Sequence, residues 1–216
     1  MNTYWGPIVE ALLVGFGLVF FLFSVFLGLR LRPRYVKRAQ EQYRATSSLY
    51  FGLVIMLIIV AWIVATAVNL SAALALFPLL GPAAFAAAID AQTHYLPNQL
   101  VGLCWLAVAF SFCLSSLVLP VAQIGFAIAV GFFAGALFWL FSYLELGISA
   151  GDVKLIPPLI GTAFHNGLLL PYIMILALLP GLYALGVYVM TKDRHQRIAY
   201  GPWMVIALPL ATFFPL

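Results

Sequence analysis

Charged residues are nearly missing from this chain. Only 7% of its 216 residues are Asp, Glu, Lys or Arg, whereas a soluble domain has about 25%. Apolar residues make up 65%, well above the roughly 45–50% of soluble proteins. A water-soluble fold with a polar surface is therefore excluded, and the composition predicts a protein embedded in lipid.

Cysteine is scarce as well. Cys104 and Cys113 fall within one apolar run, and their spacing matches neither a metal site nor a redox motif. We expect them to lie on different faces of one helix as small apolar fillers. The cysteines therefore predict no metal centre.

The chain does contain a series of long apolar runs, separated by Pro, Gly and charged residues. A helix that spans a bilayer needs about 20 such residues. We predict an all-α membrane protein, a polytopic bundle of about eight transmembrane helices in one domain over residues 1–216. The expected spans are 7–29, 49–70, 72–89, 99–119, 121–144, 153–164, 168–190 and 202–214. The sixth is short and contains Pro157 and Pro158, so we expect an irregular or tilted helix.

The basic residues predict the orientation of these spans. Six of the ten fall in the connection 30–48, one begins the sixth span, and three follow the seventh, namely Arg30, Arg32, Arg34, Lys37, Arg38, Arg44, Lys154, Lys192, Arg194 and Arg197. If the spans alternate in direction, all ten share one side, which the positive-inside rule makes cytoplasmic. Both termini are then outside. The short basic loop 30–48 should meet anionic lipid headgroups rather than nucleic acid.

Six acidic residues are present, and three of them attract attention. Glu10, Glu41 and Asp193 lie near the amino terminus or among basic residues, whereas Asp90, Glu145 and Asp152 adjoin apolar runs on the predicted cytoplasmic side. An ionisable group at membrane depth costs about 2.5–3.5 kcal/mol on insertion scales, which makes it a candidate for function. The alternative is that these acids are ordinary solvated residues of the interface.

Asp90 and Asp152 occupy opposite kinds of helix end. Asp90 comes at the end of the third predicted span, near the negative end of a helix dipole, and Asp152 begins the sixth, where free backbone N–H groups favour a carboxylate. Two carboxyl groups in unlike surroundings on one side fit an acid/base pair that activates water and protonates a leaving amine. This is the chemistry of aspartic proteolysis.

Three ordered segments of the chain resemble a known family. They are Asp90 with Pro97-Asn98 following it, Gly151-Asp152-Val153-Lys154-Leu155, and Tyr200-Gly201-Pro202-Trp203. Together they are similar to the prepilin peptidases, the type IV leader peptidases of the GxGD class of membrane aspartyl proteases. The resemblance covers the chain from about Asp90 onward.

The resemblance implies a function. Asp90 and Asp152 would be the catalytic pair of an endopeptidase at the cytoplasmic face of a bacterial inner membrane, serving a type IV pilus or a type II secretion system. The substrate would be a prepilin or pseudopilin, cut between its short basic leader and its hydrophobic helix. No metal or organic cofactor is implied. Glu145 is a candidate contact for the basic leader or an ordinary interfacial acid.

The chain also departs from the family pattern. Ser149 stands where the first Gly of the GxGD motif is expected, which removes one position of backbone freedom before Asp152. Larger members carry a cysteine-containing domain between the first two spans and also methylate the product; the connection 30–48 has no cysteine, so methyl transfer should be absent. Lys154 either tunes Asp152 or is an interfacial anchor whose ammonium reaches water.

Two other functions stay open. The chain would be an inactive scaffold of a pilus or secretion system if the fold were kept without cleavage, which Ser149 suggests and the retained acids oppose. It would be a proton-coupled transporter if the acids served as a proton relay. Transporters usually place such groups near the midplane and often show repeated halves, and we find neither feature in the sequence.

Overall fold

The chain folds into helices throughout the part that the structure, a computed structural model, describes: residues 5–41, 47–144, 149–192 and 198–214. Over these residues there are eight helices and no strands. They are α1 (Trp5–Glu41), α2 (Ser48–Val68), α3 (Leu70–Thr93), α4 (Asn98–Ser115), α5 (Val121–Tyr143), α6 (Ala150–His165), α7 (Leu169–Thr191) and α8 (Gly201–Ala211). The predicted all-α fold with eight helices is confirmed for the described residues. Glu145 lies outside them.

Six helices, α1 to α5 and α7, are long and apolar enough to cross a membrane. We predicted about eight transmembrane helices, but the other two helices are too short for a full span. With 16 and 11 residues, α6 and α8 are about 24 and 17 Å long, less than the roughly 30 Å of a hydrocarbon core. α6 is followed by Gly167, whose φ of 69° turns the chain, and Pro209 lies close to the end of α8.

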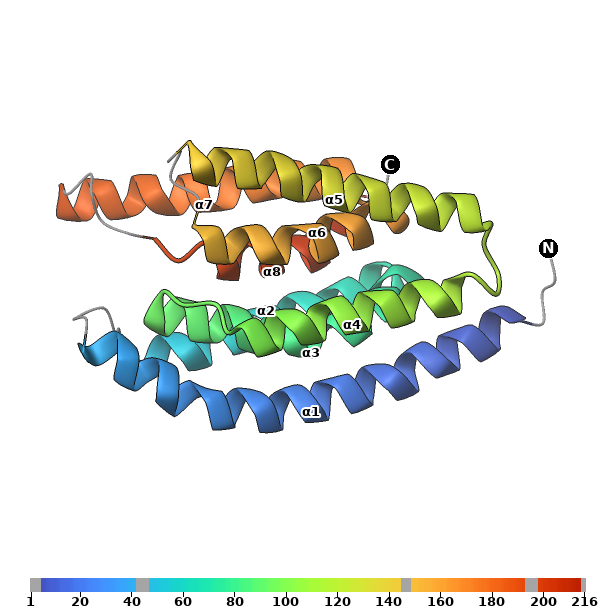
Figure 1. The fold of residues 1–216 in the computed structure, drawn as a ribbon, viewed down its shortest axis with the longest axis horizontal. Helices are drawn as coiled ribbons and strands as arrows, with labels where there is room; N and C mark the ends of the chain where they lie inside the picture. Colours follow the sequence, from blue (N-terminus) through green and yellow to red (C-terminus); the bar gives the residue numbers. More distant parts are fainter. Residues whose placement is uncertain (1–4, 42–46, 145–148, 193–197, 215–216) are drawn as a thin grey trace.

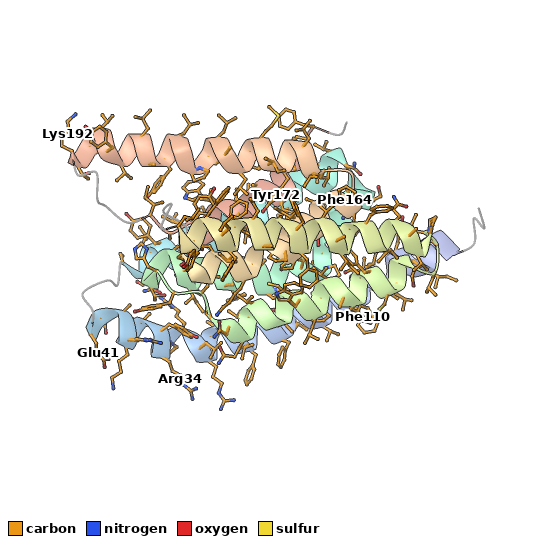
Figure 2. The ribbon with its side chains drawn as sticks, turned by 45° about the horizontal axis from the view of Figure 1, so that its top comes forward. Arg34, Glu41, Phe110, Phe164, Tyr172 and Lys192 are labelled. Carbon is orange, nitrogen blue, oxygen red and sulfur yellow. The ribbon has the colours of Figure 1, made fainter. Side chains whose placement is uncertain are left out.

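The outer surface is apolar. Large side chains such as Met190, Phe133 and Leu22 are 86%, 72% and 67% exposed, and side chains project outward along the whole of α7 (Figure 2). Soluble proteins rarely expose large contiguous patches of this kind, whereas lipid tails solvate them. The surface and the six long helices together indicate a membrane-embedded protein.

The helices form two layers (Figure 1). One contains α1 to α4 and the other α5 to α8. Within the first, α3 lies at the centre and packs on α1, α2 and α4. Its run of alanines around Ala86 is fully buried, because small side chains let neighbouring helices approach closely. The layers are joined where α8 packs on α2 and α3, and where α6 packs on α4.

In the second layer, α6 packs mainly against α5. The two backbones touch at glycines: a Cβ atom on Gly131 would lie 2.7 Å from the carbonyl oxygen of Pro157, and one on Gly161 would lie 3.2 Å from that of Ala127. Any larger side chain would push the helices apart. The small residues of α5 therefore set the position of α6 and of the two prolines within it.

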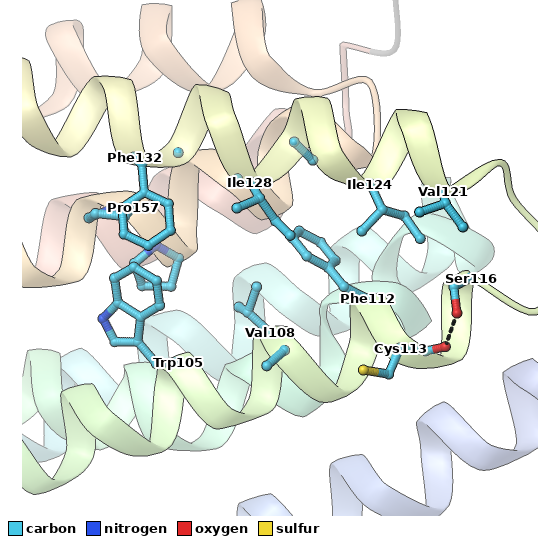
Figure 3. A pocket seen from close by; sticks show the side chains of 15 residues that line it. Trp105, Val108, Phe112, Cys113, Ser116, Val121, Ile124, Ile128, Phe132 and Pro157 are labelled. Atoms are coloured by element: carbon cyan, nitrogen blue, oxygen red, sulfur yellow. Dashed lines mark hydrogen bonds between the residues drawn. The ribbon is translucent and has the colours of Figure 1, made fainter.

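An apolar cavity of about 350 Å³ lies between α4, α5 and α6. Figure 3 shows it lined by Trp105 and Phe112 of α4, by Ile124 and Phe132 of α5, and by Pro157 of α6. Because residues from the middle of both α4 and α6 line it, these two helices are not in continuous contact along their length.

The predicted basic loop 30–48 is wrong over most of its length. α1 continues as one helix to Glu41 and is about 55 Å long. The reason is that Arg, Lys, Gln and Glu form helix well, and Pro33 does not end it. Arg32 turns inward, where its Nε donates to Oε1 of Gln92 at 2.9 Å and its guanidinium lies 4.3 Å from the ring centre of Phe51.

One end of the bundle carries the described basic residues. The odd-numbered helices end there and the even-numbered ones begin there (Figure 1). Arg34, Glu41 and Lys192 are labelled at this end in Figure 2. We call it the basic end. The described helices thus alternate in direction, as the orientation argument from the sequence assumed.

Candidate carboxylate site

Asp90 lies in the last turn of α3, at the basic end, and is 5% exposed. Its Oδ2 accepts a hydrogen bond of 3.0 Å from the backbone N–H of Gly201. Gly201 and Pro202 are the first two residues of α8, so the positive end of that helix faces the carboxylate. The negative end of α3 disfavours an anion at Asp90, and α8 offsets this effect.

Gly201 approaches Asp90 so closely that any side chain at this position would displace the Asp90 carboxylate. A Cβ atom there would lie 2.8 Å from Oδ2 and 3.3 Å from Cγ of Asp90. Pro202 has no N–H and a fixed φ, which suits the first turn of a helix. The two residues, known from the sequence only as motif support, thus bring a backbone donor to Asp90.

Asp152 is the third residue of α6 and is also 5% exposed. Its Oδ2 accepts from the hydroxyl of Ser149 at 2.8 Å and from the backbone N–H of Ser149 at 3.3 Å. In return, Oγ of Ser149 accepts from the backbone N–H of Asp152 at 3.2 Å. This reciprocal pair is a capping box, and it fixes the carboxylate at the start of α6.

Ser149 needs no glycine-like freedom. Its φ of −78° and ψ of 148° are extended values that any residue adopts. The departure from the family pattern at this position therefore leaves the backbone unstrained, and the serine hydroxyl adds two hydrogen bonds to Asp152 that a glycine would lack.

The two carboxyl groups come from different layers and lie close enough to repel each other electrostatically. Tyr200, next to Gly201, belongs to the same group: burial and the nearby Asp152 carboxylate raise the pKa of its hydroxyl. That hydroxyl donates to the carbonyl oxygen of Leu176 at 3.3 Å. Tyr200 was not predicted as a site residue, although it lies within the matched segment.

The side chains of Asn98 and Lys154 form a hydrogen bond. Nζ of Lys154 donates to Oδ1 of Asn98 at 3.0 Å, and the indole N–H of Trp105 donates to the carbonyl oxygen of Lys154 at 3.2 Å. Residues two apart on a helix do not face each other, so Lys154 points toward α4 while Asp152 points inward. Its ammonium is exposed and binds α4, which agrees better with the alternative of an interfacial anchor than with the tuning of Asp152.

The remaining motif residues support these positions. Pro97 precedes α4 in an extended conformation. A Cβ atom on Gly151 would lie 3.5 Å from Cβ of Leu96, so the first turn of α6 lies against the turn between α3 and α4. His94 ends α3 with a left-handed φ of 55°, and its N–H donates to the carbonyl oxygen of Asp90 at 2.7 Å.

A second cavity, of about 170 Å³, adjoins the site at the basic end. Ala91 and Pro202, the neighbours of Asp90 and Gly201, form part of its wall, together with the aromatic rings of Tyr50, Tyr183 and Trp203. It lies next to the segments that carry Asp90 and Gly201 and has room for a ligand group of side-chain size.

The chemistry of the site is that of two buried carboxyl groups. Among the described residues, no group of three or more His, Cys, Asp or Glu could hold a metal ion. Comparison with protein-family models, with curated proteins and with solved structures finds no match to this chain. The arguments for its function therefore come from the site and from the sequence motifs.

Proposed function

We propose that this protein is a membrane aspartic endopeptidase of the prepilin peptidase type, which removes the leader from a prepilin or pseudopilin at the cytoplasmic membrane face. The observation that carries the proposal is the placement of Asp90 and Asp152, two buried carboxyl groups at the same end of a membrane protein, in segments so close that a Cβ atom on Gly151 would lie 3.5 Å from Cβ of Leu96. Burying two carboxyl groups at one site of a membrane protein is costly, which makes them candidates for function.

The pair can divide the work of peptide hydrolysis. Because the two groups repel each other, the favoured state has one proton between them. The ionised carboxyl takes a proton from a water molecule as that water attacks the scissile carbonyl carbon. The protonated one gives its proton to the leaving amine. The described hydrogen bonds of both carboxyl groups are made by Oδ2, which leaves each Oδ1 for water or substrate.

The orientation belongs to the same proposal. The basic end, with Arg34, Lys154 and Lys192, is the cytoplasmic side by the positive-inside rule. A prepilin inserted in the bacterial inner membrane would present the junction of its basic leader and apolar helix at this depth. The cavity lined by Ala91 and Pro202 would receive a side chain near the scissile bond.

The test is processing of a co-expressed prepilin reporter, followed by gel shift. We expect Asp90→Asn and Asp152→Asn each to abolish cleavage while membrane abundance stays normal, because either change removes half of the acid/base pair. Glu41→Gln is the matched control, since this acid is exposed at the same end of the bundle and should be dispensable.

Normal processing by either aspartate variant would refute the proposal. No cleavage by the native protein of any of a panel of prepilins and pseudopilins would instead favour an inactive scaffold. If the reconstituted protein carried protons across vesicle membranes, required both aspartates for this and cleaved no prepilin, a transporter would be favoured.

A further inference from the structure

The two carboxyl groups belong to separate layers, so something must set their separation. Asp90 is bound to α8 through Gly201, whereas the described hydrogen bonds of Asp152 are those with Ser149, in its own loop. Among the described contacts, the capping box orients the side chain of Asp152 without attaching α6 to the other layer. The position of α6 relative to α3 depends on contacts elsewhere along it.

α6 is attached to α4 by hydrogen bonds near its two ends. Near the start of α6, Lys154 binds Asn98 at 3.0 Å and Trp105 binds the Lys154 carbonyl at 3.2 Å. At the other end, Nε2 of His165 lies 3.1 Å from Oγ of Ser115. Between them, the middle of the two helices borders the apolar cavity of Figure 3, and of the described residues that line it only Trp105 makes a hydrogen bond that links α4 to α6.

We propose that the Lys154–Asn98 hydrogen bond is a positioning contact that holds the first turn of α6 against the turn between α3 and α4, and thereby sets the separation of Asp90 and Asp152. Asn98 follows Asp90 by eight residues, across the end of α3 and the turn to α4, and Lys154 follows Asp152 by two residues. One side-chain bond therefore connects the two short segments that carry the carboxyl groups. The catalytic consequence of this inference rests on the proposed function, whereas the structural contact does not.

A cross-linking experiment tests the contact without any need for activity. A Cβ atom on Gly151 would lie 3.5 Å from Cβ of Leu96, which is within the range that a disulfide requires. The double variant Leu96→Cys, Gly151→Cys should therefore oxidise rapidly in membranes. Cys113, which is exposed, is replaced by Ser in this background, and the buried Cys104 stays.

Removing either partner should slow the cross-link. We expect Lys154→Met and Asn98→Leu each to lower its rate about twofold to fivefold, as fits an exposed charge-assisted contact. Lys154→Arg and Asn98→Asp keep a donor and an acceptor and should restore the native rate. Ser115→Ala, which removes the bond at the far end of the same helix pair, should leave the rate unchanged.

An unchanged cross-linking rate in Lys154→Met or Asn98→Leu would overturn the proposal. An equal decrease of the cross-linking rate in Ser115→Ala would overturn it as well, because that would indicate general loosening of α6. Because the two variants change different helices, poor accumulation of one leaves the other to decide. Prepilin processing is then measured in variants that keep the native cysteines. Lys154→Met should lower the cleavage rate, and Lys154→Arg should keep the native rate. If the cross-link responds as expected but no variant cleaves, the positioning contact stands and the proposed function fails.

Discussion

The closest approach at the site yields the sharpest prediction. In Gly201→Ala, the new Cβ would lie 2.8 Å from Oδ2 of Asp90, whereas ordinary contact begins at 3.4 Å. The carboxylate must withdraw by about 0.6 Å, which lengthens the 3.0 Å bond from the Gly201 N–H to about 3.6 Å, beyond the range of a hydrogen bond. A bond to a charged group is worth about 1.5–3 kcal/mol. We expect cleavage to slow by about tenfold to a hundredfold.

The assay is the initial rate of prepilin cleavage by purified protein in detergent, with the unfolding midpoint recorded for each variant. Gly151→Ala is the matched control: it lies beside the other aspartate, and its Cβ would meet no atom closer than 3.4 Å. It should stay within about threefold of the native rate, as fits a change of a few tenths of a kcal/mol. Native cleavage by Gly201→Ala, or a larger loss in Gly151→Ala, would refute the reasoning.

Two further predictions concern the neighbours of Asp152. Ser149→Ala removes both side-chain hydrogen bonds of the capping box and should lower the free energy of unfolding by about 1 kcal/mol, whereas Ser149→Gly should lower it by only a few tenths of a kcal/mol. Thermal unfolding in detergent measures both changes. A Gly variant more stable than the native protein would contradict the role given to Ser149. The pKa of Tyr200 is raised above its ordinary value of 10.0 by burial and by the Asp152 carboxylate, so its stabilising contribution is present below about pH 10 and is lost as pH rises through the folded-state pKa. Unfolding midpoints between about pH 9 and 11 should therefore fall less steeply in Tyr200→Phe than in the native protein, and equal slopes would show that this tyrosine does not titrate as described.

The helical content of the chain was predictable because it depends on local properties. Apolar runs, interrupted by Pro, Gly and charge, located all eight helices of the described residues, six of them of spanning length. The ends were less predictable. α1 runs twelve residues past its expected end, to Glu41, because charged residues that mark the edge of a membrane are also good helix formers. Charge therefore predicts where lipid ends but not where a helix ends.

By itself, the sequence determined which groups are unusual. Acids are so rare that Asp90 and Asp152 stood out beside apolar runs, and the alternation of helices assigned both to one end. Only the tertiary structure decided their partners. The Gly201 N–H reaches Asp90 and Lys154 reaches Asn98 because separate layers pack at that end. Such contacts depend on how helices distant in the sequence are arranged, whereas periodicity and charge describe each helix alone.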